Sequence, residues 1–305
     1  MPAQPTAQPT DIVILTEDRY LNPDLNDWYQ AQIAQEDGLV TAALANLGLC
    51  VARHSWSDPA VDWSQYGAAI FRSTWDYFDR FGEFEPWLEK VSQQTRLIND
   101  AALIRWNIDK HYLAELEQAG VAIVPTHFVA RAEATRLVDV MKERGWDEVV
   151  FKPVVSGAAR LTYRVERGHA EASEACFARC LAGETMMVQP FEPAVVESGE
   201  LSLIVIDGQA THAIRKTVSA GDFRVQDDHG GTVHAHVPSA AECRFAEAAV
   251  AACPTPPLYA RVDFVTRRDG GLRLMELELV EPELFFRFHP PAAERLAAVI
   301  KRCLS

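Results

Sequence analysis

The pattern of apolar and polar positions changes twice along the chain and divides the sequence into three parts. In the first part, short apolar runs of strand length recur at residues 11–15, 50–53, 68–71 and 97–99. The stretches between them carry apolar residues at helical spacing, and Gly48 stands where the first of these helices ends. Strands that alternate with helices are typical of a parallel βαβ sheet. The first part therefore predicts an α/β unit.

The second part is shorter and keeps the alternation of helix and strand. Its pattern predicts helices at 109–118, 133–144 and 170–181, and strands at 121–128, 149–153 and 185–189. Gly120 stands where the first of these helices closes. A unit of about 80 residues is smaller than most domains, so we expect a lid rather than an independent body.

The third part has the period-2 alternation of antiparallel strands. Two hairpins are predicted, 201–217 and 259–279, with helices at 240–252 and 291–304. The fold class expected from the whole pattern is α/β, with an α+β C-terminal part. We place the boundaries at a disordered tail (1–10), a substrate domain (11–104), a lid (105–187) and a catalytic domain (188–305).

Composition narrows the classes of function. The 305 residues are 48% hydrophobic and 24% charged, as in soluble globular proteins. With 29 basic and 43 acidic residues the net charge is −14, which repels a phosphate backbone, so nucleic acid is not an expected partner. The six cysteines form no CxxC pair, residues 1–10 lack a secretion signal, and no apolar run is long enough to cross a bilayer. We expect a cytoplasmic protein without membrane contact.

The last predicted hairpin carries a group of carboxylates. Glu276 and Glu278 alternate with apolar residues, so both side chains lie on one face of their strand, and Asp263 is on the strand paired with it. Three carboxylates at one place repel each other unless a cation neutralises them, and oxygen ligands suit Mg²⁺, with Mn²⁺ as a substitute. The alternative is the solvated face of an amphipathic strand. The absence of Lys and Arg from residues 274–279 favours the metal site.

Two lysines are candidates for binding phosphate. Lys152 follows the strand 149–151 and precedes a loop of small residues, 156–159, whose backbone amides can approach an anion. Lys110 lies at the start of the predicted helix 109–118, where a cation is unfavourable unless an anion is close. For each, an exposed Lys beside an ordinary turn is the simpler alternative. No GxxxxGK[ST] or GxGxxG motif occurs.

Taken in order, these segments resemble the ATP-grasp superfamily. The resemblance rests on Lys110 in IRWNIDKHYL, Lys152 in VVFKPVVSGAAR, the segment MMVQPFEP, and Asp263 with LMELELVEP. It covers roughly residues 104–290 and looks most like small ligases: bacterial glutathione synthetase, the ribosomal-protein glutamate ligases, and the cyclo-ligase that forms D-cycloserine from O-ureido-D-serine. It implies an ATP-grasp fold with an N-terminal Rossmann-like pre-ATP-grasp domain, a small central lid and an antiparallel-sheet catalytic domain.

The resemblance also implies roles for individual residues. ATP would be bound by Lys110, Lys152, Ser156, Gly157, by Gln189, Pro190 and Phe191 as the adenine hinge, and by Glu200 at the ribose, with Glu192 and Glu197 as rivals. The transferring phosphoryl group would meet Lys216 and Arg224, the metal would be held by Asp263, Glu276 and Glu278, and Gln226 would face the substrate. The chain departs from the family in carrying Glu278 where Asn is common, and a single glycine in the phosphate loop.

Substrate recognition is expected at the carboxyl edge of the first sheet, where open α/β sheets bind ligands. Arg72, Ser73, Thr74 and Asp76 follow the strand 68–71, and Arg72 suits a carboxylate. Residues 16–19 follow the first strand at the same edge. Trp75 and Tyr77 fit the core equally well.

The predicted function is an ATP-dependent carboxylate–amine ligase that acts on an amino-acid-like small molecule through an acyl phosphate. One alternative is an intramolecular cyclo-ligase, in which a single substrate supplies both reacting groups. Another class is a non-catalytic nucleotide-binding scaffold, which has no need for the metal carboxylates and both lysines. By analogy with relatives we expect a homodimer.

Overall fold

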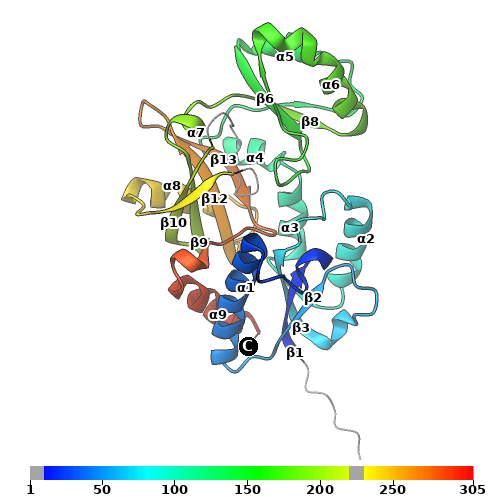
Figure 1. Ribbon diagram of the computed structural model, residues 1–305, viewed down its shortest axis with the longest axis vertical. Helices are drawn as coiled ribbons and strands as arrows, with labels where there is room; N and C mark the ends of the chain where they lie inside the picture. The colour runs from blue at the N-terminus through cyan, green and yellow to red at the C-terminus, as the bar shows by residue number, and fades with distance from the viewer. Residues whose placement is uncertain (1–9, 220–229, 305) are drawn as a thin grey trace, which may run out of the picture.

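Within residues 10–219 and 230–304, which the computed structural model describes, the strands form three sheets (Figure 1). The residues expected to be a disordered tail lie outside this range, except Thr10, which begins the first strand. Figure 1 shows the small middle unit at one end of the molecule, with the other two units packed side by side below it.

The N-terminal sheet is parallel throughout and has the order β2-β1-β3-β4. Its elements are β1 (Thr10–Thr16), α1 (Trp28–Asn46), β2 (Val51–Ser55), β3 (Tyr66–Ser73), α2 (Phe81–Val91) and β4 (Arg96–Ile98). Helix α1 begins where the Asp27 carboxylate accepts the first free backbone N–H groups, and it ends before Gly48, whose φ is 79°. The predicted βαβ unit is confirmed.

The chain then forms two short helices, α3 (Ala101–Ile108) and α4 (Tyr112–Gln118). The helix predicted at 109–118 is present as α4 but begins three residues later, because the backbone turns after α3, which was not predicted, and places Lys110 in the turn. Both helices contact the C-terminal sheet: the Asn107 side chain bonds the backbone of Leu277 and Leu279, and Leu277 N–H donates to the Tyr112 hydroxyl at 3.0 Å. Lys110 is thereby fixed against the last strand of that sheet.

The lid has its own antiparallel sheet, in the order β5-β8-β6-β7, and its own core. Its elements are β5 (His127–Val129), α5 (Leu137–Arg144), β6 (Glu148–Pro153), β7 (Tyr163–Glu166), α6 (Ala170–Gly183) and β8 (Met186–Pro190). Strand β5 is shorter than predicted, because residues 121–126 lie along the C-terminal sheet instead, where Val124 N–H donates to the Leu274 carbonyl. Strand β7 was not predicted.

The C-terminal sheet is antiparallel, in the order β11-β10-β9-β12-β13, as the two predicted hairpins require. Its elements are α7 (Ala194–Glu197), β9 (Glu200–Ile206), β10 (Gln209–Thr217), β11 (Thr232–His236), α8 (Ala240–Ala251), β12 (Tyr259–Thr266), β13 (Leu272–Glu278) and α9 (Pro291–Leu304). Short 3₁₀ helices occur at Asp18–Tyr20, Trp63–Gln65, Arg167–His169 and Phe286–Phe288.

Helices α1 and α9 lie between the N-terminal and C-terminal sheets and join them into one core. Ile14 of β1, Ile204 of β9 and Leu296 of α9 belong to the same cluster of fully buried side chains. Because interiors are close-packed, this shared core fixes the position of one sheet relative to the other. In the described part of the chain, no helix is long and apolar enough to cross a membrane.

Candidate active site

A cavity of about 400 Å³ lies where the three units meet, and residues of all three line it. Every predicted nucleotide and metal residue that the structure describes is on its wall: Lys110, Lys152, Ser156, Gly157, Gln189, Pro190, Phe191, Glu200, Lys216, Asp263, Glu276 and Glu278. Arg224 and Gln226 lie outside the described residues. Segments up to 168 positions apart, from 110 to 278, are therefore brought to one place.

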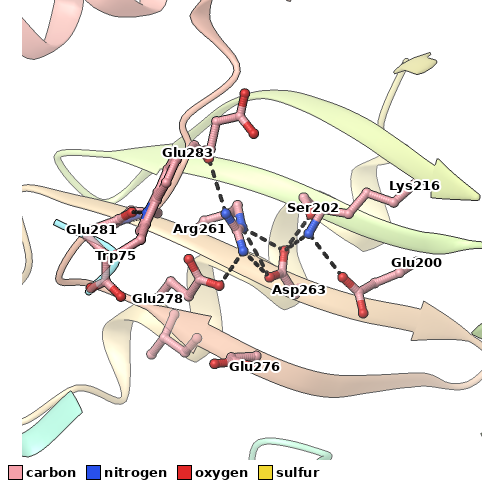
Figure 2. Close-up of polar contacts among 12 residues, drawn as sticks. Trp75, Glu200, Ser202, Lys216, Arg261, Asp263, Glu276, Glu278, Glu281 and Glu283 are labelled. Atoms are coloured by element: carbon pink, nitrogen blue, oxygen red, sulfur yellow. Dashed lines mark hydrogen bonds and ion pairs between the residues drawn. The ribbon is translucent and has the colours of Figure 1, made fainter. Parts of the chain in front are cut away.

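The floor of the cavity is one face of the C-terminal sheet. On β12 the side chains of Arg261 and Asp263 face the cavity, while Val262 between them is fully buried in the core behind the sheet. Across the strand pair, Arg261 lies opposite Glu278 and Asp263 lies opposite Glu276. The strand register thus places acidic and basic groups beside each other on one surface (Figure 2).

Asp263 is at the centre of this surface and is held by three donors. The Arg261 guanidinium binds its carboxylate at 2.9–3.1 Å, the Ser202 hydroxyl donates to it at 2.5 Å, and the Lys216 ammonium lies 3.6 Å away (Figure 2). Burial alone would raise the pKa of Asp263, but Arg261 and Lys216 outweigh it and hold the pKa below its usual value. Asp263 therefore stays ionised.

Glu278 and Glu200 flank this centre. Glu278 also pairs with Arg261, yet burial dominates and raises the pKa of Glu278 to about 7. Glu200 pairs with the Lys216 ammonium at 3.1 Å, and burial raises the pKa of Glu200 as well. Arg261 and Lys216 thus pair with Glu278 and Glu200, whose negative charge burial disfavours.

Glu276 is held by the two predicted phosphate lysines. The Lys110 ammonium lies 3.1 Å and the Lys152 ammonium 3.5 Å from its carboxylate oxygens. Burial opposes ionisation of Glu276, but these two cations outweigh it and lower its pKa. Lys110 is buried and also donates to the Ser156 carbonyl at 2.5 Å, so it connects the phosphate loop to the metal carboxylate. A lysine from the α3–α4 turn and one from the lid meet on one carboxylate.

The chemistry of this donor set fits a divalent cation brought in by phosphates. Asp263 and Glu276 are hard oxygen ligands in cross-strand register, and both line the cavity. Among residues 10–219 and 230–304, no three His, Cys, Asp or Glu side chains are gathered as a complete metal site. Mg²⁺ is commonly bound by one or two carboxylates, with substrate phosphates and water completing the coordination, so two carboxylates suffice.

The phosphate loop is packed against the N-terminal unit. A Cβ added at Gly157 would lie 2.5 Å from the Phe78 ring, so this close approach requires glycine. Ala158 and Ala159 have φ of 47° and 55°, left-handed values that glycine adopts more easily. Arg160 completes the contact by binding Asp79 of the N-terminal unit at 2.8 Å and Glu184 of the lid at 2.7 Å. The 156–160 segment therefore contacts the N-terminal unit along one side of the cavity.

The adenine end of the cavity is apolar and bounded by the predicted hinge. Gln189 donates its amide to the Thr126 hydroxyl at 2.9 Å, and the Arg164 guanidinium lies 3.7 Å from the centre of the Phe191 ring. The remaining wall is aliphatic, with Val124, Val150, Val195 and Met275. A slot of this kind suits a flat heteroaromatic ring.

The three candidate ribose residues, Glu192, Glu197 and Glu200, differ in whether they line the cavity. Glu200 and Glu192 both line the cavity, whereas Glu197 pairs with the exposed Arg268 and lines a different surface pocket. Glu192 in turn lies 3.4 Å from Arg267. The geometry favours Glu200 and Glu192 over Glu197 as the group near a ribose.

The four predicted substrate residues at the edge of β3 do not line the cavity. Arg72 is buried, 3.3 Å from Asp37, and donates to the Pro282 carbonyl at 3.2 Å. Ser73 bonds the Thr16 hydroxyl, and the partly buried Asp76 binds the Trp56 indole and Arg80. Thr74 is fully buried, and its hydroxyl has no hydrogen-bond partner in the described part of the chain. The contacts of Arg72, Ser73 and Asp76 favour structural roles. The N-terminal wall of the cavity is formed instead by Arg19, Tyr20, Tyr29, Trp75 and Phe78.

Arg261 was missed by the sequence analysis, although a signal was present. It stands two positions before Asp263 on the same strand, so period-2 geometry already placed it on the same face. The acidic segment after β13 was also missed: Glu281, Glu283 and Phe285 line the cavity because the chain turns back towards the N-terminal unit there.

Comparison with known proteins gives relatives over the whole fold. Residues 12–99 match the family described as the N-terminal domain of the D-cycloserine synthetase DcsG. The cycloserine biosynthesis protein DcsG of Streptomyces lavendulae is 35% identical over 276 residues, which are 85% of this chain and 90% of that protein. The crystal structure of D-cycloserine synthetase DcsG has a TM-score of 0.83 at 31% identity and covers 96% of this chain and 100% of its own.

A more distant structure shares the fold. The ATP-grasp ligase PsnB, solved with the precursor peptide PsnA2 and AMPPNP, has a TM-score of 0.62 at 17% identity and covers 98% of this chain and 100% of its own. The fold predicted from the sequence motifs is confirmed, and so is the enzyme class.

Proposed function

The chain belongs to the ATP-grasp ligases of the DcsG family, and from this we propose that it activates the carboxylate of an amino-acid-like substrate with ATP and joins it to a nitrogen nucleophile. Membership makes it an ATP-dependent ligase that works with a divalent metal ion. The observation that carries the finer proposal is the charged floor of the cavity, where Arg261 and Lys216 lie beside Asp263 and next to the Lys110–Lys152–Glu276 group.

The proposed reaction has two steps. A carboxylate oxygen of the substrate attacks the γ-phosphorus of ATP, the bond from that phosphorus to the β-phosphate oxygen breaks, and ADP is released. The nitrogen nucleophile then attacks the carbonyl carbon of the acyl phosphate, loses a proton, and inorganic phosphate leaves. Phosphoryl transfer of this kind depends mainly on positioning and on stabilising charge.

We assign each part of this reaction to residues according to their position in the cavity. Lys110 and Lys152 would bind the ATP phosphates, with the 156–159 loop closing over them, while Gln189, Pro190, Phe191 and Glu200 would hold the nucleoside. Lys216 and Arg261, with Arg224 as a predicted addition, would stabilise the charge that develops on the transferring group. The metal, which we propose to be Mg²⁺ held by Asp263 and Glu276, with Glu278 as a third ligand only if it leaves Arg261, would neutralise phosphate charge.

The contacts between the lid and the N-terminal unit support this chemistry. An acyl phosphate is hydrolysed if water reaches it, and the contacts of Gly157 with Phe78 and of Arg160 with Asp79 cover the cavity on the side of the N-terminal unit.

An intramolecular cyclisation is the second candidate, favoured by the similarity to the D-cycloserine synthetase DcsG at 31% and 35% identity. In that case one substrate supplies both the carboxylate and the nitrogen nucleophile.

We test the proposal with purified protein, ATP and Mg²⁺, screened for ADP release against single amino acids, pairs of amino acids, and O-ureido-D-serine. Products are weighed by mass spectrometry. A product assembled from two substrates supports ligation, and one built from a single substrate molecule supports cyclisation. Absent or substrate-independent ADP release would overturn both and support a nucleotide-binding scaffold. Replacing Mg²⁺ by Mn²⁺ should retain activity, and chelation should abolish it.

The cellular context is part of the proposal. We propose a cytoplasmic enzyme, supported by the free thiols of Cys50, Cys176, Cys180, Cys243, Cys253 and Cys303, which suit a reducing compartment. We also propose a homodimer by analogy with the family, which light scattering on the purified protein tests directly.

A further inference from the structure

The substrate end of the cavity combines an acidic segment with aromatic rings. Tyr20, Tyr29 and Trp75 of the N-terminal unit form a cluster, with ring centres 5.6 Å apart for Tyr20–Trp75 and 6.2 Å for Tyr29–Trp75. Glu281 lies against this cluster, since the Trp75 indole N–H donates to its backbone carbonyl at 2.9 Å. Figure 2 shows Trp75, Glu281 and Glu278 on the same side of Arg261.

Glu281 differs from the other carboxylates that line the cavity. Each of those has a cationic partner: Lys110, Lys152, Lys216, Arg261, Arg267 or Arg287. In residues 10–219 and 230–304, no Lys, Arg or His side chain pairs with the Glu281 carboxylate. The group is partly buried, and burial raises the pKa of Glu281 to about 8; Glu278 adds to the effect, and the Lys110 ammonium opposes it without forming an ion pair. A cation from outside the protein would satisfy it.

The backbone around Glu281 is held rigidly in place. Consecutive carbonyls of the segment accept hydrogen bonds from separate side chains: Trp75 to residue 281, Arg72 to Pro282, Arg261 to Glu283 and His212 to Leu284. Further along, the buried Glu36 carboxylate accepts from the backbone N–H groups of residues 286 and 287. Such anchoring lets a carboxylate bind a ligand without losing much freedom of its own.

We propose that Glu281, together with the rings of Tyr29 and Trp75, is the subsite that binds the protonated amine of the substrate; the Tyr20 ring beside them already has the Arg19 guanidinium over it, 4.5 Å from its centre. A carboxylate supplies the charge for an ammonium group, and the faces of Trp and Tyr rings attract a cation as well. The inference rests on the proposed function, because it fixes the orientation of an amino acid whose carboxylate must point to Arg261 and Lys216.

The arrangement also selects against other substrates. The nearby Arg19 is bound by Glu17 at 2.6 Å and Lys110 by Glu276, so neither cation is left to pair with Glu281. A carboxylic acid without an amine would leave Glu281 unpaired in a poorly solvated place, which costs binding. Glu281 is therefore proposed to set the preference for substrates that carry an amine.

The experiment compares two probes, O-ureido-D-serine and its deaminated analogue 3-(ureidooxy)propanoate. Their binding is measured by calorimetry at saturating AMPPNP, so that turnover is not needed. We expect the wild type to bind the amino acid about 10- to 100-fold more tightly than the analogue, in line with a charged hydrogen bond. Glu281→Gln should remove most of this preference while leaving the affinity for the analogue within about threefold.

Two further variants complete the test. Glu283→Gln is the matched control, because Glu283 lies two residues away and already pairs with Arg287, so the preference should persist. Trp75→Phe keeps a ring but removes the indole N–H that holds Glu281, and should reduce the preference about three- to tenfold.

The outcomes separate this inference from the proposed function. Equal binding of both probes to the wild type, no binding of the amino acid, or equal loss for both probes in Glu281→Gln would overturn the subsite. Preferential binding that Glu281→Gln abolishes supports the subsite even if no ADP is released in the activity screen, a result that would overturn only the proposed function.

Discussion

The N-terminal and C-terminal sheets both carry charged residues at the cavity, but they use them differently. In the C-terminal sheet, Arg261, Asp263 and Glu276 face the cavity. Arg261 pairs with Asp263 on the same strand, and Glu276 pairs with Lys110 of the α3–α4 turn and Lys152 of the lid. In the N-terminal sheet, Arg72 and Asp76 turn inward and are satisfied by protein groups before any ligand arrives. A position at the carboxyl edge of a parallel sheet is thus not enough to make a site residue. What matters is whether the side chain faces the cavity, because Arg261 pairs with Asp263 and Glu278 and still lines it.

The two sheets are still connected through the segment after β13. Arg72 binds the Pro282 carbonyl and Trp75 binds the Glu281 carbonyl, so the N-terminal unit positions the acidic residues that the C-terminal sheet contributes to the cavity. The contrast between the cavity face of the C-terminal sheet and the carboxyl edge of the N-terminal sheet can be tested by removing one charge at a time, beginning with the largest expected effect.

Glu276→Gln should nearly abolish ADP release, by about 10³-fold or more, because it removes a metal carboxylate and leaves two lysines without their partner. Circular dichroism and thermal unfolding should show a folded protein. The surface change Glu197→Gln serves as the control, since that carboxylate only pairs with the exposed Arg268. Activity retained in Glu276→Gln would contradict the metal assignment.

Arg261→Met should reduce kcat by about 10²–10³-fold, because the variant loses positive charge at the transferring phosphoryl group. It also leaves Asp263 and Glu278 with less compensation, so the free energy of unfolding should fall. Arg261→Lys keeps the charge but loses the bidentate contact, so its kcat should lie between those of the wild type and Arg261→Met. Steady-state kinetics on all three proteins decides the matter, and an unchanged kcat in Arg261→Met would remove Arg261 from the site.

Arg72→Met should act on stability instead. We expect a loss of about 2–3 kcal/mol in the free energy of unfolding, because Asp37 and the Pro282 carbonyl lose a buried donor. The kcat of the folded enzyme should change by no more than about threefold. Urea unfolding and kinetics measured together distinguish this from the role predicted from the sequence: a large increase in KM for substrate at unchanged stability would restore Arg72 as a substrate residue.

His212 gives the smallest effect, and it appears only on acidification. Burial lowers the pKa of His212 from 6.5 to about 4, and its ring N–H donates to the Leu284 carbonyl. Between these values the unfolded chain binds a proton that the folded chain does not, so stability falls as the pH falls, by about 1.4 kcal/mol per pH unit.

The comparison is therefore between pH 6.5 and pH 5, where His212 should cost the wild type about 2 kcal/mol. In His212→Gln the side chain at this position does not titrate. Between pH 6.5 and pH 5 the free energy of unfolding of this variant should therefore fall by about 2 kcal/mol less than that of the wild type. Parallel curves for the two proteins would show that His212 does not contribute.

The sequence by itself determined the local patterns and the kinds of chemistry. Alternation within residues 274–279 placed Glu276 and Glu278 on one face, and Lys152 before a loop of small residues indicated phosphate binding, because a strand's period and a side chain's charge are local properties. The order of these motifs was enough to indicate the fold. It was also enough to name twelve residues that now line one cavity.

Only the tertiary structure decided which charges face the cavity. Arg72 and Arg261 are both arginines with internal partners, but Arg72 is buried against Asp37 and a distant carbonyl, whereas Arg261 pairs with Asp263 and Glu278 on the cavity wall. Likewise, Glu281 became a candidate only when the chain turned back and set it against Trp75, more than 200 positions away. Such partners come from the packing of separate units, and the energy of a charge depends on the groups and solvent around it rather than on its neighbours in sequence.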